Sequence, residues 1–277
     1  MRSLRRSMGD FLDLLAEAAV ENIESGYYNV SSATKLIQRP RKSLKEAILG
    51  CRRAAIISEI KFSSPSSGFL RTDRDVEGIA RDMVEAGVVG ISILTEPRYF
   101  SGSLETLAKV SSLVNAPILM KDIILSRCQI DAAYILGADA VLLIMGLFKR
   151  GYCEIDIESM INFSHELKLE VLLEVHDIEE FRSALSTDAD MIGINNRDLR
   201  SFKVDINTTK NVLEKFSRVE IGNRPIISES GIRSPDDVRF LRRCGVDAFL
   251  VGTAIMSAVD IREFVASLVN AYEESQS

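Results

Sequence analysis

The sequence predicts an α/β fold, a single (β/α)8 TIM barrel with an N-terminal helical extension. From about residue 55 onward, short apolar runs alternate with longer segments of helical period, which is typical of βα units around a parallel sheet. Eight such runs occur, and eight βα units are the number that closes this barrel. Four of the runs also repeat one pattern, in which mostly apolar positions end on a charged residue.

The segment before the first predicted strand, residues 1–54, contains two stretches of helical period. An amphipathic helix is expected over 10–24, where acidic residues recur at helical spacing, and a second helix over 43–53. The turn "QRPRKS" separates them. No linker rich in Gly, Pro or Ser divides the chain, so 1–277 is expected to form one domain, with 55–277 as the barrel and the extension capping one of its ends.

The predicted strands are short and apolar, and the predicted helices that accompany them are longer and amphipathic. In chain order the strands are 54–61, 90–94, 117–122, 140–144, 171–175, 191–195, 225–229 and 248–252. Helices are expected at 74–86, 127–137, 177–186, 235–244 and 260–273.

Composition excludes several classes of function. The net charge of -6 argues against a basic nucleic-acid-binding surface. The longest apolar stretch, "ILGADAVLLIMGLF", is too short for a membrane span and contains Asp139. Four scattered cysteines without a CxxC pair fit a reducing cytoplasm, and His165 and His176 lack the spacing of metal ligands. We therefore expect a cytoplasmic monomer with no nucleic-acid partner, no membrane partner and no metal.

The charged residues that end the odd-numbered strands are the main functional signal. Glu59, Lys121, Glu174 and Glu229 occupy matching positions, and Lys61 faces the same way as Glu59 because it follows two residues later. Active sites of TIM barrels lie at this edge of the strands. The alternative is an ion-pair network that merely plugs the barrel mouth. Five buried charges are expensive compared with apolar packing, which favours a function in proton transfer.

The loops after the last two strands predict a phosphate site. The motifs "SESGI" and "LVGTAIM" bring Ser230, Gly231, Gly252 and Thr253 to loops where many barrels bind phosphate. Glycine lets backbone N–H groups approach an anion, and Thr253 is expected to cap a short helix, "TAIM". Ordinary barrel turns are the alternative for these residues.

Two other loops carry candidates for ligand binding. The loop "KFSSPSSGFL" after the first strand is long enough to cover a ligand, and Lys61 and Ser64 are expected to reach the same phosphate. Asn195 ends the sixth strand, and Arg197 follows it where a guanidinium can clamp a carboxylate. A surface ion pair with a nearby aspartate is the alternative for Arg197. No GxSxG motif occurs, so proton transfer by Lys and Glu is what remains.

These motifs together resemble the indole-3-glycerol phosphate synthase family over nearly the whole barrel. The resemblance rests on "SEIKFSSPSSG", "ISILTEPRYFSGSLETL", "PILMKD", "GADAVLLI", "LLEVHD", "IGINNRDL", "SESGI" and "LVGTAIM", in the family's order and at its spacing. It implies that the chain closes a phosphorylated small molecule, 1-(2-carboxyphenylamino)-1-deoxyribulose 5-phosphate, to indole-3-glycerol phosphate in tryptophan biosynthesis. The reaction releases CO2 and water and needs no cofactor.

The resemblance also implies roles for the site residues. Lys121 would protonate the substrate carbonyl, Glu174 would handle the proton in dehydration, and Glu59 would orient the lysines. Lys61 would contact the substrate carboxylate or phosphate and act as an acid in the later step. The implied catalytic residues are Lys121, Glu174, Glu59, Lys61 and Asn195. The residues implied to contact the substrate are Arg197, Glu229, Ser230 and Phe100. The residues implied to bind its phosphate are Ser64, Lys61, Gly231, Gly252 and Thr253.

One departure and two competitors qualify this expectation. Ile123 stands where the family usually has Phe, and Asp122, of opposite parity to Lys121, is expected to be structural. An apolar wall around the ring site would lower the pKa of a neighbouring lysine.

A barrel like phosphoribosylanthranilate isomerase would normally need a Cys and Asp pair at the strand ends. A non-catalytic barrel that binds a phosphorylated metabolite is the other alternative, and the set of Lys and Glu residues argues against both.

Overall fold

Eight parallel strands close into a barrel in the computed structural model, which describes residues 10–30, 36–37, 39–64, 68–71, 75–198 and 202–272. The strands pair in the order β1-β10-β9-β8-β7-β6-β5-β4, with β4 completing the circle against β1. They are β1 (Ala55–Ile60), β4 (Gly90–Leu94), β5 (Ile118–Lys121), β6 (Ala140–Ile144), β7 (Glu170–Val175), β8 (Met191–Asn195), β9 (Ile226–Glu229) and β10 (Ala248–Val251). The predicted barrel is confirmed, and every predicted strand lies within one residue of an observed one.

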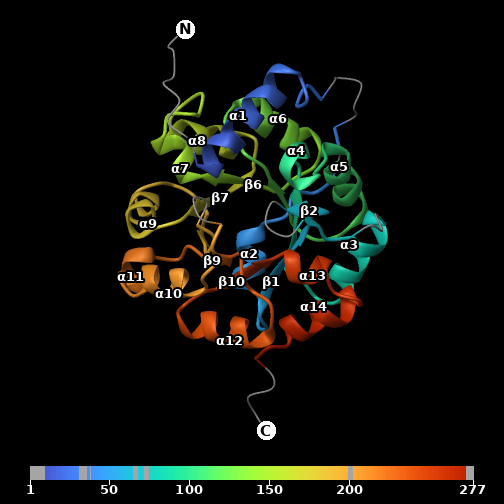
Figure 1. Ribbon diagram of the computed structural model, residues 1–277, viewed down its shortest axis with the longest axis vertical. Coiled ribbons are helices and arrows are strands. Elements are labelled where there is room, and N and C mark those ends of the chain that lie inside the picture. The colour runs from blue at the N-terminus through green and yellow to red at the C-terminus, as the bar shows by residue number, and fades with distance from the viewer. Residues whose placement is uncertain are drawn as a thin grey trace.

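Helices follow the strands and surround the barrel (Figure 1). Ser or Asp residues begin many of them, and their side chains accept a backbone N–H of the first helical turn, as Ser103, Asp156, Asp177, Ser234 and Asp260 do. The longer helices are α3 (Val76–Glu85), α5 (Leu104–Leu113), α6 (Arg127–Ile135), α8 (Ile157–Glu166), α9 (Ile178–Leu185), α10 (Asn207–Leu213), α12 (Pro235–Arg243) and α14 (Ile261–Val269).

Several short elements in the loops were not predicted. They are the hairpin β2 (Ser63–Ser64) and β3 (Gly68–Phe69), and the helices α4 (Pro97–Phe100), α7 (Met145–Lys149) and α11 (Arg218–Ile221). The predicted short helix "TAIM" does form, as α13 (Thr253–Met256).

The buried side chains form two cores that alternate along each strand. On β1, Ile56 and Ile60 belong to the core between the strands and the helices, whereas Ala55 and Ile57 belong to the core inside the barrel. Glu59 has the parity of the inner pair, so its carboxylate reaches the lumen at the carboxyl end of the strand. Because side chains alternate along the strand, the charged residue that ends this apolar run faces the inside of the barrel.

The N-terminal extension contacts both ends of the barrel. Helix α1 (Phe11–Glu24) contributes Phe11 to the lining of the pocket at the carboxyl end of the strands. Helix α2 (Leu44–Leu49) lies at the opposite end, where Glu170, the first residue of β7, accepts the backbone N–H groups of Leu44 at 2.7 Å and Lys45 at 3.1 Å.

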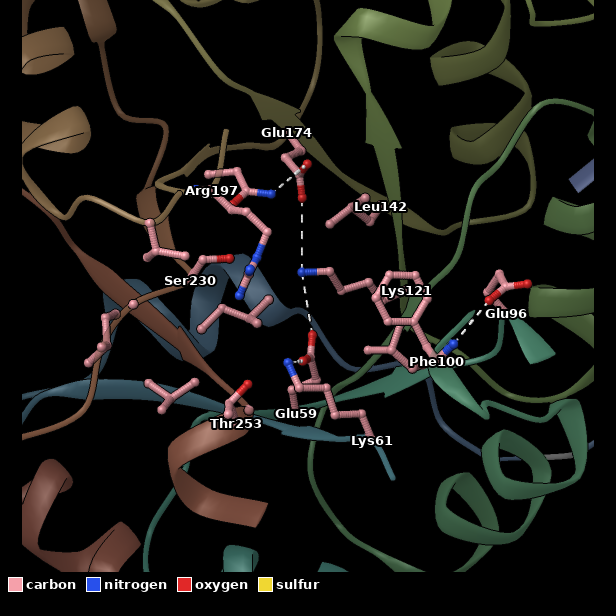
Figure 2. A pocket seen from close by; sticks show the side chains of 18 of the residues that line it. Glu59, Lys61, Glu96, Phe100, Lys121, Leu142, Glu174, Arg197, Ser230 and Thr253 are labelled. Atoms are coloured by element: carbon pink, nitrogen blue, oxygen red, sulfur yellow. Dashed lines mark hydrogen bonds and ion pairs between the residues drawn. The ribbon is translucent and has the colours of Figure 1, made fainter. Parts of the chain in front are cut away.

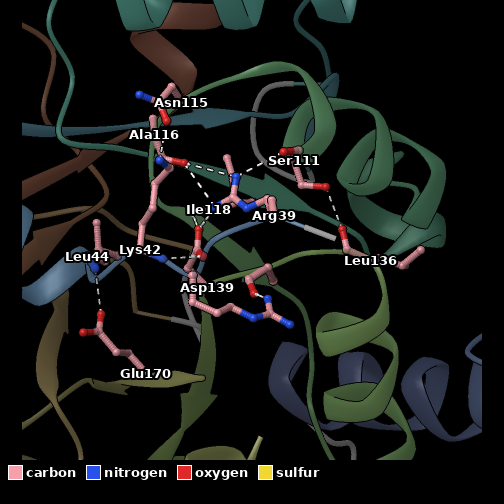
Figure 3. Close-up of polar contacts among 12 residues, drawn as sticks. Arg39, Lys42, Leu44, Ser111, Asn115, Ala116, Ile118, Leu136, Asp139 and Glu170 are labelled. Atoms are coloured by element: carbon pink, nitrogen blue, oxygen red, sulfur yellow. Dashed lines mark hydrogen bonds and ion pairs between the residues drawn. The ribbon is translucent and has the colours of Figure 1, made fainter. Parts of the chain in front are cut away.

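The connection between α1 and α2 is held by a second buried carboxylate. Asp139 accepts the Arg39 guanidinium and, at 2.9 Å each, the backbone N–H groups of Lys42 and Ile118 (Figure 3). The aspartate that interrupts the longest apolar stretch therefore fastens the extension to the start of β5. Among the helices of the described residues, none has the length and apolarity needed to cross a bilayer.

Candidate active site

A cavity of about 600 Å³ lies at the carboxyl ends of the barrel strands. Its volume is in the range of small-molecule sites. Figure 2 shows Lys121 pointing into it between Glu174 and Glu59, with Phe100 on one side and Ser230 and Thr253 on the other. The cavity brings together most of the residues that the sequence singles out, namely Glu59, Lys61, Phe100, Lys121, Glu174, Asn195, Arg197, Ser230, Gly231, Gly252 and Thr253.

Lys121 lies at the centre of the charged residues. Its Nζ is 2.7 Å from Glu229 Oε2, 3.4 Å from Glu59 Oε2 and 3.9 Å from Glu174 Oε2. Glu229 is fully buried behind the lysine, whereas 17% of the Lys121 side chain is exposed toward the cavity. Lys121, Glu59 and Glu174 therefore line the cavity, whereas Glu229 pairs with the lysine outside the lining.

The carboxylates keep Lys121 charged. Burial pulls the pKa of Lys121 down, but Glu229, Glu59 and Glu174 outweigh burial and hold this pKa above its ordinary value. Desolvation thus acts on the pKa of Lys121 in the expected direction, but the carboxylates reverse the net shift. A charged, partly exposed ammonium that is held by three carboxylates can donate a proton to a ligand.

Glu59 links the two lysines. Its Oε1 pairs with Lys61 Nζ at 2.7 Å while its other oxygen faces Lys121. Burial raises the pKa of Glu59, but the two lysines outweigh burial and keep this pKa below its ordinary value. Gly252 makes room for the carboxylate, because a Cβ at this position would lie 2.3 Å from Glu59 Oε1. The glycine of "LVGTAIM" thus has a steric reason to be there.

Glu174 is oriented by its neighbour on the next strand. Asn195 Nδ2 donates to Glu174 Oε1 at 3.0 Å, and Asn195 Oδ1 accepts the backbone N–H of Arg197 at the same distance. The Arg197 side chain lies in the pocket wall, where its guanidinium donates to the Phe202 carbonyl at 3.4 Å. The side chain therefore lines the cavity, next to the strand end that carries Asn195.

The candidate phosphate residues come together on one side of the cavity. Ser230 and Gly231 both have left-handed backbone, with φ of 67° and 86°, and lie beside Gly252 and Thr253 in the lining. The expected cap is wrong: Gly252 is the N-cap of α13, Thr253 is the first helical residue, and no side chain makes a capping hydrogen bond. The side chain of Ser64 lies outside the described part of the structure.

Asp122 turns away from the lysine cluster into a network of its own. The Tyr28 hydroxyl is 3.0 Å from both carboxylate oxygens, the Thr95 hydroxyl donates to Oδ2, and the backbone N–H of Ile123 donates to Oδ1 at 2.7 Å. Burial raises the pKa of Asp122 to about 6. Thr95 also donates its backbone N–H to the Lys121 carbonyl at 3.0 Å, so the network fixes the backbone that carries the lysine.

Aromatic residues from unexpected segments line the apolar side of the cavity. Phe11 of α1 packs against Tyr99 and Phe202, with ring centroids 5.3 and 4.8 Å apart, and Phe11 and Phe202 join Phe100 and Ile123 in the lining. Sequence reasoning missed Phe11 and Phe202 because neither lies at a strand end. They supply aromatic surface near the position where Ile123 departs from the family pattern.

Two charged residues of the lining were also missed. Glu96 is fully buried and caps α4, accepting the backbone N–H groups of Arg98, Tyr99 and Phe100, and it thereby fixes the helix that carries Phe100. Arg233 lines the cavity beside the candidate phosphate residues. The "TEP" of the second βα loop, an acidic residue before a helix-starting Pro, is a signal that could have identified Glu96 as a cap.

The family model and the relatives found by sequence agree on one family. The family model described as indole-3-glycerol phosphate synthase matches residues 15–268. Proteins of that name are 41% identical in Caldanaerobacter subterraneus subsp. tengcongensis (77% of this chain, 80% of the relative) and 43% identical in Methanocaldococcus jannaschii (77% of each). The protein of the same name from Lactiplantibacillus plantarum is 36% identical over 93% of this chain and 97% of its own.

Solved structures support the fold independently. The thiamine phosphate pyrophosphorylase from Pyrococcus furiosus superimposes with a TM-score of 0.60 at 20% identity, covering 85% of this chain and all of that one. At this identity the likeness establishes the barrel architecture and carries no information about the reaction.

Proposed function

Since the chain belongs to the indole-3-glycerol phosphate synthase family, carboxy-lyases of tryptophan biosynthesis, we propose how its pocket performs the family's ring closure. The substrate is 1-(2-carboxyphenylamino)-1-deoxyribulose 5-phosphate, and the products are indole-3-glycerol phosphate, CO2 and water. The observation that carries the proposal is a charged, partly exposed Lys121 held by three carboxylates in a cavity of suitable size.

The two ends of the substrate bind at opposite sides of the cavity. The phosphate binds at Ser230, Gly231, Gly252 and Thr253, with Lys61 and Ser64 closing over it. The aromatic ring packs on Phe100, and Arg197 faces its carboxylate. Holding both ends of a flexible molecule brings the reacting carbons together, which is a large part of the acceleration in cyclisations.

Lys121 is the acid in the first step. The ring carbon that bears the carboxylate attacks the keto carbon, while Lys121 Nζ gives a proton to the keto oxygen, which becomes a hydroxyl. The bond to the carboxylate then breaks, CO2 leaves, and the electron pair of that bond restores the aromatic ring. General acid catalysis of this kind contributes on the order of 10² to 10⁴ in rate.

Glu174 and Lys61 carry out the dehydration that follows. Glu174 takes a proton from the ring methylene next to nitrogen, and Lys61 gives a proton to the new hydroxyl, which leaves as water. The five-membered ring thereby becomes aromatic. Glu59 serves both steps by pairing with both lysines, Asn195 and Glu229 hold the carboxylate and the ammonium in place, and no cofactor takes part.

The wider setting of the enzyme is also a proposal. We expect residues 1–277 to act as one domain and as a monomer, because α1, α2 and the barrel together form the site and the core. The net charge of -6 supports the absence of a nucleic-acid partner, and scattered cysteines support a cytoplasmic location.

The proposal is tested by turnover of the purified protein with this substrate, followed by the appearance of indole fluorescence. Lys121→Met is expected to lower kcat by about 10² to 10⁴. Lys109→Met serves as the matched control, since Lys109 is exposed and pairs only with Glu77 among the described residues. Undiminished turnover in Lys121→Met would overturn the assignment of the acid, and ligand-induced stabilisation without turnover in the wild type would favour a binding-only barrel.

A further inference from the structure

A half-buried histidine lies beside the carboxylate that is assigned to dehydration. His176 follows β7 and precedes α9, and 18% of its side chain is exposed. Its Nε2 is 3.4 Å from Glu174 Oε1, and its Nδ1 is 3.5 Å from Glu180 Oε2. The imidazole therefore stands between two carboxylates, one in the cavity lining and one on α9.

The contacts divide the two oxygens of Glu174 between different tasks. Oε1 receives the Asn195 amide at 3.0 Å and faces His176 Nε2, whereas Oε2 faces Lys121. Nε2 is buried and makes no hydrogen bond among the described residues, although Oε1 is close. A small rotation would align this donor with the carboxylate. An imidazolium can donate from both ring nitrogens, which matches the two carboxylates on either side.

The charges around His176 favour its protonated form. Burial lowers the pKa of His176, but Glu180 and Glu174, with a smaller effect from Glu229 on β9, outweigh burial and raise this pKa above its ordinary value. His176 in turn helps to hold the pKa of Glu180 below its ordinary value, together with Lys149 of α7. Lys121 is a further cation beside Glu174, with its Nζ 3.9 Å from Oε2.

We propose that His176 is a positioning residue for dehydration: braced by Glu180, its imidazole holds Oε1 of Glu174, so that Oε2, on the side of Lys121, is presented to the substrate proton. The inference rests on the proposed role of Glu174. Glu180 is fixed independently, because its carboxylate accepts the backbone N–H of His176 at 2.9 Å. The contact places the Glu180 carboxylate beside the imidazole, 3.5 Å from Nδ1.

His176→Gln and Glu180→Gln test the proposal, and His165→Gln is the matched control. His165 is the other histidine of the chain and pairs with Asp190 at 2.9 Å, away from the cavity. His176→Gln is expected to lower kcat roughly 10- to 100-fold with little change in KM, because a misplaced catalytic group costs rate. The acid limb of the kcat profile is expected to move to higher pH, since the site loses a cation.

An isotope effect separates positioning from a purely structural role. Substrate deuterated at the methylene carbon next to nitrogen is expected to show a larger kinetic isotope effect in His176→Gln than in the wild type, because proton removal by Glu174 becomes slower. Release of CO2 in a single turnover is expected to keep its wild-type rate. An unchanged isotope effect and pH profile, or an equal loss in CO2 release, would overturn the proposal.

Titration by NMR tests the charge directly. With two histidines in the chain, His165→Gln assigns both signals. The signal of His176 is expected to titrate above the ordinary pKa, and Glu180→Gln is expected to lower that pKa while the protein stays folded. A His176 signal that remains neutral near pH 6 would contradict the inference. Failure of the wild type to turn over substrate would instead contradict the proposed function, so the two failures are distinguishable.

Discussion

Replacing Lys121 by Met removes the cation at the centre of the cluster and tests the electrostatic argument through stability. Met keeps most of the volume of the lysine stem, so packing changes little. Glu229 and Glu59 lose partners at 2.7 and 3.4 Å, and both carboxylates are buried. A buried charge that loses its partner destabilises a protein by about 3–5 kcal/mol.

The sign of the pH dependence follows from the carboxylates. Burial, together with Glu174 and Glu59, already raises the pKa of Glu229 to about 7 despite the pairing with Lys121. Without Lys121, Glu59 loses one of the two lysines that hold its pKa down, and the folded pKa of Glu229 rises further above its unfolded value. A carboxyl of this kind supports folding at low pH and ceases to do so as pH rises through its folded pKa. Destabilisation of Lys121→Met is therefore expected to be small near pH 5 and largest near pH 8.

Urea unfolding of the wild type, Lys121→Met and Lys109→Met at pH 5 and pH 8 measures this effect. Lys109→Met is expected to stay within about 0.5 kcal/mol of the wild type at both values, as an exposed ion pair should. If Lys121→Met lost the same stability at both pH values, or none at either, the picture of an ammonium that neutralises buried carboxylates would be refuted.

Three further predictions concern the groups around the lysine. Gly252→Ala places a Cβ 2.3 Å from Glu59 Oε1, so it is expected to displace that carboxylate. The variant is expected to lower kcat roughly 10- to 100-fold and to destabilise the fold by about 1–3 kcal/mol. A kcat at the wild-type level in steady-state kinetics would contradict this expectation. Tyr28→Phe removes the hydroxyl at 3.0 Å from Asp122 and is expected to lower the free energy of unfolding, measured in urea, by about 1.5–3 kcal/mol. An unchanged urea midpoint would show that the network around Asp122 does not stabilise the fold. Glu229→Gln cannot ionise, whereas burial and the neighbouring carboxylates raise the pKa of Glu229 to about 7. As pH rises from 4.5 to 8, the free energy of unfolding of the variant is therefore expected to increase relative to that of the wild type, by as much as about 3 kcal/mol. A constant difference between the two proteins across this range would argue against the raised pKa of Glu229.

The barrel and the lysine cluster were predictable because both follow from strand parity. A charged residue at the end of an apolar run must either face the lumen or break the outer core. The first alternative holds on all four strands, where the residues that face the lumen are Glu59, Lys121, Glu174 and Glu229. The contrasting position of Asp122, in a network with Tyr28 and Thr95, follows from the same alternation.

The remaining parts of the site depend on contacts between distant segments. Phe11 reaches the cavity because α1 packs at the carboxyl end of the barrel, and its amphipathic pattern gives no sign of which end it covers. Thr253 was expected as a cap, but β10 ends one residue earlier and leaves Gly252 at that position. His176 follows Glu174 by two residues, the same spacing that places Lys61 beside Glu59, so strand parity could have identified this pair.

The most direct test of the central claim is the structure of the protein with a substrate analogue whose keto group is reduced to an alcohol, which cannot cyclise. The account predicts the phosphate at Ser230, Gly231, Gly252 and Thr253, the aromatic ring against Phe100, and the alcohol oxygen within hydrogen-bond distance of Lys121 Nζ. An analogue bound with its phosphate elsewhere, or with its alcohol oxygen away from Lys121, would contradict the assignment of this lysine as the acid of ring closure.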